Sequence, residues 1–459
     1  MSNSNSTIVA ISTSPGIGGI GIIRMSGKDC FKILDKVFKQ KNHKDIDDIK
    51  GYSLKYGYIM DKDEVIDEVL VSYFKAPNSY TTENMCEINS HGGIVVMNKI
   101  LDLCIKKGAS LAEPGEFTKR AFLGGRIDLS QAEAVIDIIN AKTDKEAKMS
   151  VNQLEGALSE KINEIRHIIL NMMADIEASI DYPEYDIEDV TSSQMLDMLD
   201  LVDKKITLLE NSFDNGKILR DGIKTAIIGR PNAGKSSLLN IILNEERAIV
   251  TEIEGTTRDS IEEYIQIKGI PVKIIDTAGI RNSDNVVEKI GINKAIEIAK
   301  NSDLIIAIFD ISKKLEEDDD LILDLISNRP AIIILNKTDL KVNNIELNKI
   351  KLLNKPIVEM STKTREGLDK LYNEIAEMFK LEEIGNDGEL IVSNMRHKEV
   401  IIRAKEDIKE AKATIMNNLP IDIISSYLRE ILEDLGKITG ETVTEDIINE
   451  IFSKFCLGK

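Results

Sequence analysis

Hydrophobic and polar positions follow three different patterns along the 459 residues of this chain. From residue 6 to about 125, short β-branched runs such as STIVAIST and EVLVSYFKA are separated by Gly and Pro, which is typical of an α+β domain. From Asp128 to about Asn215 the apolar positions have helical spacing. From Ile223 to about Lys380, apolar runs alternate with amphipathic stretches, which predicts a doubly wound parallel sheet. Helical patterns resume after the polar segment GNDG.

Several helix boundaries can be predicted. Ser130 and Glu133 have capping-box spacing, so we expect a helix to begin near Asp128. We also expect a helix capped at Thr444 that ends before Cys456 and turns Phe452 and Phe455 toward the core. Apolar stripes support two C-terminal helices, one with Ile424, Leu428, Ile431, Leu432 and Leu435, the other with Ile447, Ile448, Ile451 and Phe452.

These patterns indicate a multidomain chain in which an α/β domain is inserted into a discontinuous α-helical domain. Insertion is tolerated where the termini of a domain lie close together. The expected limits are 1–125 for the N-terminal α+β domain, 126–216 and 383–459 for the two helical segments, and 217–382 for the insert.

The strongest motif is GRPNAGKS, from Gly229 to Ser236, which lies between a strand-like run and a helix-like run. In a P-loop the glycines let backbone amides converge on phosphate oxygens, the lysine reaches the outer phosphates, and the hydroxyl binds Mg²⁺. We therefore expect phosphate contacts from Asn232, Ala233, Gly234, Lys235, Ser236 and Ser237.

Two further motifs have the order expected of a nucleotide switch. DTAG places Asp276, Thr277, Ala278 and Gly279 after a strand, where the carboxylate can hold the Mg²⁺ shell and the Gly279 amide can sense a γ-phosphate. Before it, the segment Thr251, Glu252, Ile253, Glu254, Gly255, Thr256 and Thr257 offers Thr257 as a second Mg²⁺ ligand. Ile280 stands where small GTPases commonly use Gln to orient the attacking water, so another group must do this.

The base-recognition motif is NKTD, with Asn336, Lys337 and Asp339, followed by STK, with Ser361, Thr362 and Lys363. Guanine presents a ring N–H beside an exocyclic amine, and one carboxylate can accept both. Adenine lacks this pair. The sequence therefore predicts GTP as the nucleotide.

Composition limits the other possibilities. A net charge of −19 argues against a large phosphate-binding surface, so an RNA substrate would need help from a basic partner. Apolar runs are too short for a membrane span, MSNSNS does not resemble a signal peptide, and the four Cys show no metal-ligand spacing, so a cytoplasmic protein with reduced thiols is expected. The glycines of SPGIGGIG fit GxGxxG, but a strand-like segment follows instead of the helix that a dinucleotide site requires.

Together, GRPNAGKSS, EGTTRD, DTAGI, NKTD, RNSDNVVEKIGI and the terminal FCLGK resemble the MnmE (TrmE) family of tRNA modification GTPases over the whole length. The resemblance implies a homodimer in which K⁺ replaces an arginine finger. It assigns K⁺ binding to Asn232, Thr251, Ile253 and Thr256, and positioning of the water to Glu288, which would otherwise be read as a solvated carboxylate.

The resemblance also implies that the N-terminal domain dimerises and binds a 5-formyl- or methylene-tetrahydrofolate through Arg24, Glu87, Arg126 and Lys459. Many relatives have Lys where Arg126 stands. With the FAD-containing partner MnmG, such a protein modifies carbon 5 of the wobble uridine of certain tRNAs with an aminomethyl or carboxymethylaminomethyl group, and Cys456 belongs to the modification site. From the residues alone, Arg24 and Arg126 would be surface cations, His91 a turn or packing residue, and Cys456 a packed thiol.

Two alternatives remain at this stage. A regulatory GTPase such as a ribosome-assembly factor would carry a basic RNA-binding appendage, which the acidic helical segments do not resemble. A lipid-anchored switch would depend on the terminal CLGK, which fits a prenylation box poorly because it ends in Gly-Lys.

Overall fold

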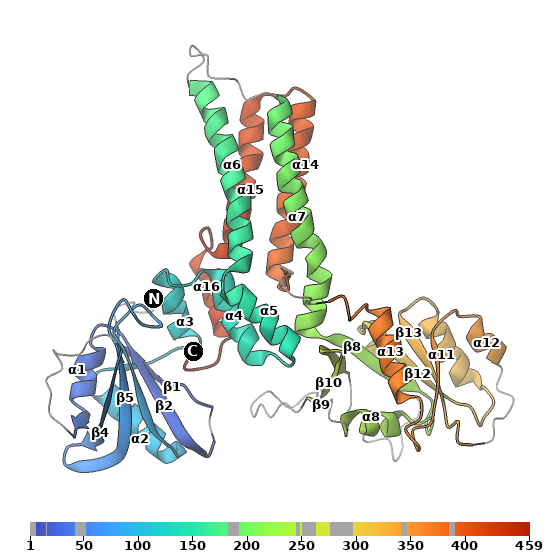
Figure 1. Ribbon diagram of the computed structural model, residues 1–459, viewed down its shortest axis with the longest axis horizontal. Coiled ribbons are helices and arrows are strands. Elements are labelled where there is room, and N and C mark those ends of the chain that lie inside the picture. Colours follow the sequence, from blue (N-terminus) through green and yellow to red (C-terminus); the bar gives the residue numbers. More distant parts are fainter. Residues whose placement is uncertain are drawn as a thin grey trace. The chain divides into compact units, whose positions relative to one another are not determined.

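The computed structural model describes residues 6–14, 16–41, 52–181, 192–244, 248–249, 263–275, 297–340, 347–384 and 391–459 (Figure 1). The strand-rich N-terminal part, the long helices and the α/β part that were predicted from the sequence are all present. No helix in these ranges is long and apolar enough to cross a membrane.

The N-terminal part forms a seven-stranded sheet with strand order β3-β4-β5-β6-β2-β1-β7, antiparallel except between β1 and β7. Helices α1 (Cys30–Asp35) and α2 (Ile94–Lys106) pack on one face over an apolar core. The Gly-rich stretch leads into strand β2, as predicted, and not into a helix. The strands are β1 (Ile8–Ile11), β2 (Gly18–Ser26), β3 (Phe38–Gln40), β4 (Ser53–Asp61), β5 (Glu64–Phe74), β6 (Met85–Gly92) and β7 (Ser110–Leu111).

The helical part corrects one predicted boundary. Helix α4 begins at Leu129, and its capping box is formed by Asp128 and Gln131. Each of these side chains accepts the other residue's backbone N–H at 2.9 Å, while Ser130 already lies inside the helix. The prediction of Ser130 and Glu133 was therefore wrong. The helices are α3 (Glu116–Leu123), α4 (Leu129–Asn140), α5 (Asp144–Leu154), α6 (Ala157–Asp181), α7 (Ser192–Asp221), α14 (Met395–Met416), α15 (Ile421–Thr439) and α16 (Glu445–Ser453).

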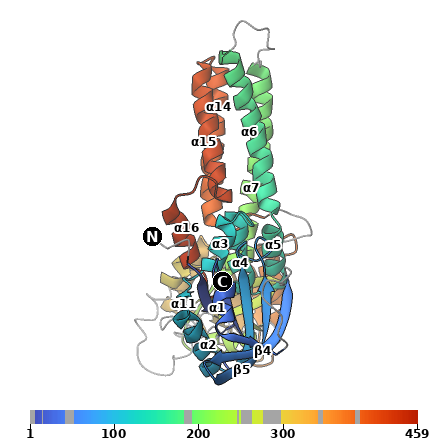
Figure 2. The same cartoon turned by 90° about the vertical axis from the view of Figure 1, so that its left-hand side faces the viewer.

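Helices α6 and α15 run side by side (Figure 2). The predicted stripe of α15 is buried at Ile424, Leu428, Ile431 and Leu435. In α16, Thr444 is the N-cap and Phe452 is buried, whereas Ile447 is 41% exposed and does not belong to the core. Phe455 is buried, as predicted, but it lies beyond the end of the helix at Ser453.

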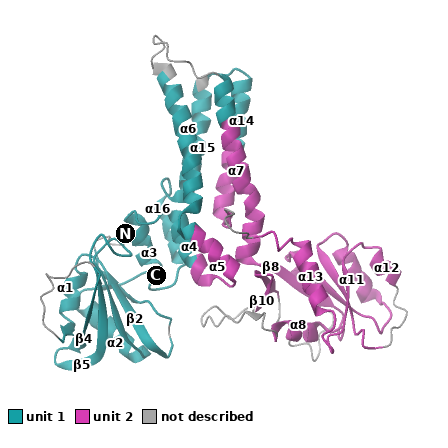
Figure 3. Ribbon diagram, viewed as in Figure 1, with its two compact units in different colours: residues 1–136, 153–198, 406–459 teal, residues 137–152, 199–405 magenta. Residues whose placement is uncertain are grey.

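The chain divides into two compact units (Figure 3). Unit 1 comprises residues 1–136, 153–198 and 406–459, and unit 2 comprises residues 137–152 and 199–405.

Unit 2 contains a second seven-stranded sheet, with strand order β14-β13-β12-β8-β11-β10-β9. The predicted apolar runs form the parallel part, and β10 and β9 add an antiparallel edge that the sequence analysis missed. Helices α8 and α13 cover one face, and α11 and α12 the other. The elements are β8 (Ile223–Gly229), α8 (Lys235–Leu243), β9 (Ala248–Ile249), β10 (Glu263–Ile267), β11 (Ile270–Ile274), β12 (Leu304–Asp310), α11 (Glu317–Ser327), β13 (Ala331–Asn336), α12 (Leu347–Lys351), β14 (Ile357–Met360) and α13 (Leu368–Met378).

Candidate functional site

The P-loop of unit 2 joins the end of β8 to the start of α8. Gly234 has a φ of 112°, and a Cβ added there would lie 2.1 Å from Nδ2 of Asn336, so a side chain at this position would require a shift. Asn232 is exposed and also has a left-handed backbone, with φ of 60°. Ser236 and Ser237 follow in the first turn of α8, where backbone N–H groups and the helix dipole favour an anion. The loop therefore leads into a helix N-terminus, where backbone N–H groups can bind an anion.

Lys235 folds back over this loop. Its Nζ donates hydrogen bonds to the carbonyl oxygens of Gly229 at 2.6 Å and Arg230 at 2.8 Å. Burial lowers the pKa of Lys235 to about 8. Phosphate oxygens in the loop would supply the negative charge that stabilises this ammonium group.

Asn336 joins three loops and is fully buried. Its Nδ2 donates to the Ala233 carbonyl oxygen in the P-loop at 2.7 Å and to Oγ1 of Thr362 at 3.2 Å. Its Oδ1 accepts the Thr362 backbone N–H at 3.0 Å. Three motifs that are up to 130 residues apart in the sequence numbering, around Ala233, Asn336 and Thr362, are therefore held together by one amide side chain.

Hydrogen bonds also hold the side chains of the neighbouring base-recognition residues in place. Oδ1 of Asp339, which is exposed, accepts the Ser361 hydroxyl at 2.7 Å. Lys337 donates to Oδ2 of Asp310 at 2.6 Å. Burial would raise the pKa of Asp310, but hydrogen bonds from Lys337 and Ser312 hold it below its usual value. The sequence analysis did not identify Asp310, which the register of β12 and β13 places beside Asn336.

Part of the predicted nucleotide site lies outside the described residues. This applies to Thr251, Glu252, Ile253, Glu254, Gly255, Thr256, Thr257, Asp276, Thr277, Ala278, Gly279 and Glu288. Among the described residues there is no cluster of three His, Cys, Asp or Glu side chains that could hold a metal ion. The described donors, the Ser236 hydroxyl and the Asn232 amide, are oxygen ligands of the kind that Mg²⁺ and K⁺ accept, so they fit ions that complete their shells with phosphate, water and other loops.

A second group of candidate residues lies in unit 1. Arg24 on β2 lies opposite Glu87 on β6, and its Nε and Nη2 contact Oε1 of Glu87 at 2.9 and 2.8 Å. The Arg24 guanidinium also lies over the rings of Tyr80 and Phe117, at 5.5 and 5.6 Å from their centroids. Arg126 lies 4.4 Å from the centroid of the same Tyr80 ring and donates to the Tyr80 carbonyl oxygen at 2.6 Å. Two predicted residues, Arg24 and Arg126, thus contact one tyrosine that the sequence analysis did not identify, and Glu87 joins them through Arg24.

The C-terminal tail joins this group. The Gly458 carbonyl oxygen accepts the Ser12 hydroxyl at 3.0 Å and Nη1 of Arg24 at 3.4 Å. The Lys459 carbonyl oxygen accepts the backbone N–H of Phe117 at 3.1 Å. Gly458 has a φ of 85°, and a Cβ there would lie 2.2 Å from the Ile11 carbonyl oxygen. The tail is therefore fitted closely against the N-terminal sheet.

Cys456 differs from the other cysteines in its surroundings. Cys30, Cys86 and Cys104 are buried, and burial raises the pKa of Cys104 to about 12, whereas Cys456 is exposed. The interpretation of Cys456 as a packed thiol was therefore wrong. Its backbone is held by the Gly115 N–H, which donates to the Cys456 carbonyl oxygen at 3.4 Å.

The interpretations of Arg24, Arg126 and His91 from the residues alone have different outcomes. Arg126 is exposed, as expected of a surface cation. Arg24 is not a simple surface cation, because only 16% of its side chain is exposed and it is paired. His91 is not a packing residue, since its side chain is 71% exposed, with Nδ1 2.7 Å from Oδ1 of Asp67.

Comparisons with known proteins agree with this arrangement. Residues 7–126 match the family model "GTP-binding protein TrmE N-terminus", and residues 129–456 match "MnmE helical domain". The chain is 48% identical to the tRNA modification GTPase MnmE of Clostridioides difficile (strain 630) over 99% of both chains. It is 50% identical to the protein of that name from Thermoanaerobacter pseudethanolicus, again over 99% of both chains. Among solved structures, the G domain of the T. maritima FeoB iron transporter matches 34% of this chain and 98% of its own length, with 28% identity and a TM-score of 0.25. The sequence identity to these relatives, the coverage of both chains and the two matching family models show that this chain belongs to the MnmE family of tRNA modification GTPases.

Proposed function

We propose that this protein is a K⁺-stimulated GTP hydrolase that acts in modification of the wobble uridine of tRNA. The observation that carries the GTPase part is the junction at Asn336, which joins the P-loop to the base-recognition loops. A nucleotide that fills this site must offer phosphates to Lys235 and a base to Asp339 at the same time. The carboxylate of Asp339 selects guanine because it accepts the ring N–H and the amine together.

In this proposal the residues of the chain bind and orient GTP. Ser236 and Thr257 would hold Mg²⁺, and Asn232, Thr251, Ile253 and Thr256 would hold K⁺. These cations neutralise negative charge that develops on the transferred phosphoryl group. Glu288 would orient the attacking water, a role that Ile280 cannot fill because its side chain has no hydrogen-bonding group.

The group around Tyr80 supports a folate site. The Glu87 carboxylate suits the N–H and amine pair of a pterin, and Arg24, Arg126 and Lys459 would be further contacts of the folate. A tetrahydrofolate derivative supplies a one-carbon unit in such chemistry. Cys456 lies on the tail that Gly458 attaches beside Arg24, which supports a role of its thiol in modification.

We further propose a cytoplasmic homodimer that works with MnmG and tRNA. The acidic chain, with a net charge of −19, supports a division of labour in which the partner supplies much of the basic surface for tRNA. The domain limits that we propose remain 1–125, 126–216, 217–382 and 383–459.

The nucleotide assignment can be tested by Asp339→Asn. An amide at this position can donate to the carbonyl oxygen that xanthine has in place of the guanine amine. We expect the variant to lose GTP hydrolysis by at least about tenfold and to gain hydrolysis of xanthosine triphosphate. Wild type is expected to hydrolyse GTP faster in KCl than in NaCl. Asp324→Asn, an exposed residue of α11, is the matched control. Unchanged GTP hydrolysis in Asp339→Asn would contradict the proposal.

A further inference from the structure

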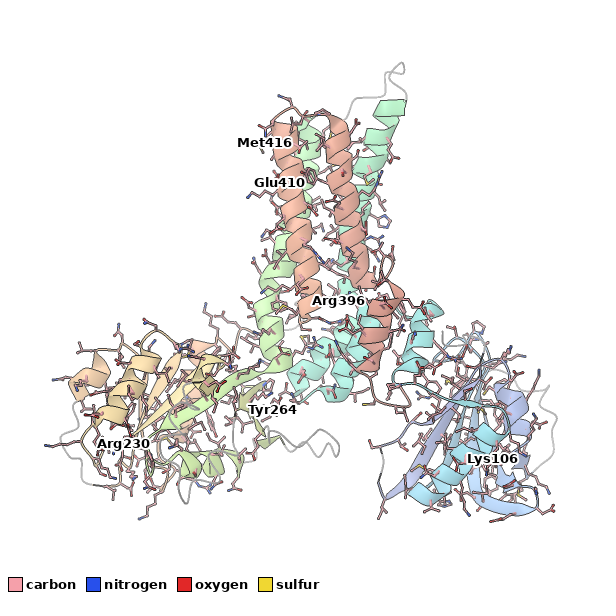
Figure 4. All side chains as sticks on the ribbon, turned by 180° about the vertical axis from the view of Figure 1, so that it is seen from behind. Lys106, Arg230, Tyr264, Arg396, Glu410 and Met416 are labelled. Atoms are coloured by element: carbon pink, nitrogen blue, oxygen red, sulfur yellow. The ribbon has the colours of Figure 1, made fainter. Side chains whose placement is uncertain are left out.

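Arg230, the second residue of the P-loop motif, is attached to the start of helix α11. Its Nη2 lies 2.6 Å from Oε2 of Glu316, and its Nη1 lies 3.1 Å from Oδ2 of Asp319. The side chain of Asp319 is 6% exposed, that of Arg230 is 21% exposed and that of Glu316 is 62% exposed. The guanidinium of Arg230 (labelled in Figure 4) is therefore paired with one buried and one solvated carboxylate.

The buried carboxylate belongs to a rigid element. Asp319 and Glu316 form the capping box of α11, in which Oδ2 of Asp319 accepts the Glu316 backbone N–H at 3.0 Å. The same oxygen atom thus receives the helix cap and the guanidinium. Because a capping box fixes the first turn of a helix, Arg230 is attached to a fixed point.

The backbone of Arg230 is part of the lysine site. Its carbonyl oxygen accepts Nζ of Lys235 at 2.8 Å and the Ala233 N–H at 3.2 Å. On the other side of the loop, Asn336 holds the Ala233 carbonyl oxygen at 2.7 Å. Asn232, with its left-handed backbone, lies between these two attachments.

We propose that Arg230 is a positioning residue for the nucleotide site, which it serves by attaching the P-loop to Asp319. The inference rests on the proposed function and deepens it. Without the guanidinium contact, the segment from Arg230 to Asn232 would lose its attachment to α11 and keep only its hydrogen bonds within the loop. The carbonyl that receives Lys235 and the amide of Asn232 would then occupy a range of positions, and small displacements of positioning groups are costly to binding and catalysis.

Glu316 and Asp319 are expected to contribute unequally to holding the Arg230 side chain in place. An exposed ion pair such as that with Glu316 contributes little, because water screens it and both side chains lose freedom. Neutralising Asp319 leaves the guanidinium facing a buried amide, which is far less favourable. Asp319→Asn keeps one side-chain oxygen, which can take the position of Oδ2 and accept the helix cap, so it separates the loss of charge from the loss of the cap.

The test uses the full-length protein and a fluorescent GDP analogue, whose dissociation rate constant is measured without hydrolysis. We expect Arg230→Met and Asp319→Asn to accelerate dissociation by about tenfold, and Glu316→Gln by less than about threefold. Arg230→Lys should restore part of the loss, because it keeps one charged contact. The K⁺ concentration for half-maximal GTP hydrolysis should rise in the first two variants. The GDP analogue should dissociate from the double variant Arg230→Met/Asp319→Asn no faster than from the faster of the two single variants, because both changes remove the same interaction.

Arg329→Met is the matched control, because Nη1 of Arg329 donates to the Ala299 carbonyl oxygen at 2.7 Å, away from the P-loop. Thermal unfolding shows whether each variant is folded. If Arg230→Met and Asp319→Asn lower only the melting temperature and leave dissociation unchanged, the positioning role is wrong. If wild type itself fails to bind guanine nucleotides, the proposed function fails first, and the two failures are thereby distinguished.

Discussion

Glu146, in helix α5, is a buried carboxyl group whose ionisation should oppose folding of unit 2. The residue is 3% exposed, and its Oε2 accepts the Lys142 backbone N–H at 2.7 Å. Burial raises the pKa of Glu146 to about 7. The Lys142 hydrogen bond and the charges of Lys142 and Arg220 oppose this rise, and Asp137, which pairs with Arg220 at 3.0 Å, adds to it.

The sign and size of the effect follow from this shift. A folded-state pKa of about 7 against an ordinary value of 4.5 corresponds to roughly 3 kcal/mol. Because the folded pKa is raised, the stability that the neutral carboxyl provides is fully present below about pH 4.5 and is lost as the pH rises through about 7. Glu146→Gln keeps an acceptor for Lys142 and cannot ionise. The variant should therefore gain stability over wild type as the pH rises, by up to roughly 3 kcal/mol near pH 8.

Urea unfolding of wild type and Glu146→Gln, followed by circular dichroism at about pH 5 and about pH 8, measures this difference. The variant should gain little at the lower pH and most at the higher one. Glu155→Gln, an exposed residue just after α5, controls for the loss of a surface charge and should show no such dependence. A difference between Glu146→Gln and wild type that is the same at both pH values would refute the reasoning.

Three further variants test the sites. Asn336→Ala removes three hydrogen bonds between loops and should destabilise unit 2 by roughly 3 kcal/mol. Thermal unfolding with and without GDP measures this loss. Equal melting temperatures of variant and wild type would contradict the role of this amide. Gly458→Ala places a Cβ against the Ile11 carbonyl, so the tail should detach and trypsin should cleave after Lys454 several-fold faster, whereas Gly19→Ala, with open space around its Cβ, should not change the rate. Glu87→Gln should weaken binding of 5-formyltetrahydrofolate by about tenfold or more in calorimetry, and an affinity equal to that of the exposed control Glu68→Gln would exclude Glu87 from the site.

Much of the fold could be predicted because it follows from local patterns of apolar and polar residues. Continuous apolar runs identified the parallel strands of unit 2, whose residues point into two buried cores, as Ile305 and Ile306 of β12 do. Strand β10 was missed because it lies at an antiparallel edge and its apolar residues are interrupted. The cap of α4 was misplaced because Asp128-Leu129-Ser130-Gln131 offers two capping residues, and spacing alone does not choose between them.

In the candidate sites too, residues in contiguous motifs could be predicted, whereas residues joined by long-range contacts could not. The nucleotide loops were predicted because phosphate and guanine recognition use short contiguous motifs. The contacts of Gly458 with Ser12 and Arg24 join residues more than 400 positions apart, and no periodicity in the sequence reports such a pairing. Tyr80 and Asp310 were missed for a related reason, since each contacts a predicted residue but belongs to no motif itself. Arg230 lies within GRPNAGKS, but its partners Glu316 and Asp319 are far away in the sequence.

We propose that the GTPase domain and the C-terminal tail both serve tRNA modification. The most direct test is mass spectrometry of tRNA nucleosides from bacteria that lack their own MnmE, complemented with this chain or with Cys456→Ser. We expect wild type to restore the modified wobble uridine, and the variant, still folded and hydrolysing GTP, to fail. Restoration by both would show that Cys456 is only structural, and restoration by neither, in cells that also express the matching MnmG, would contradict the account.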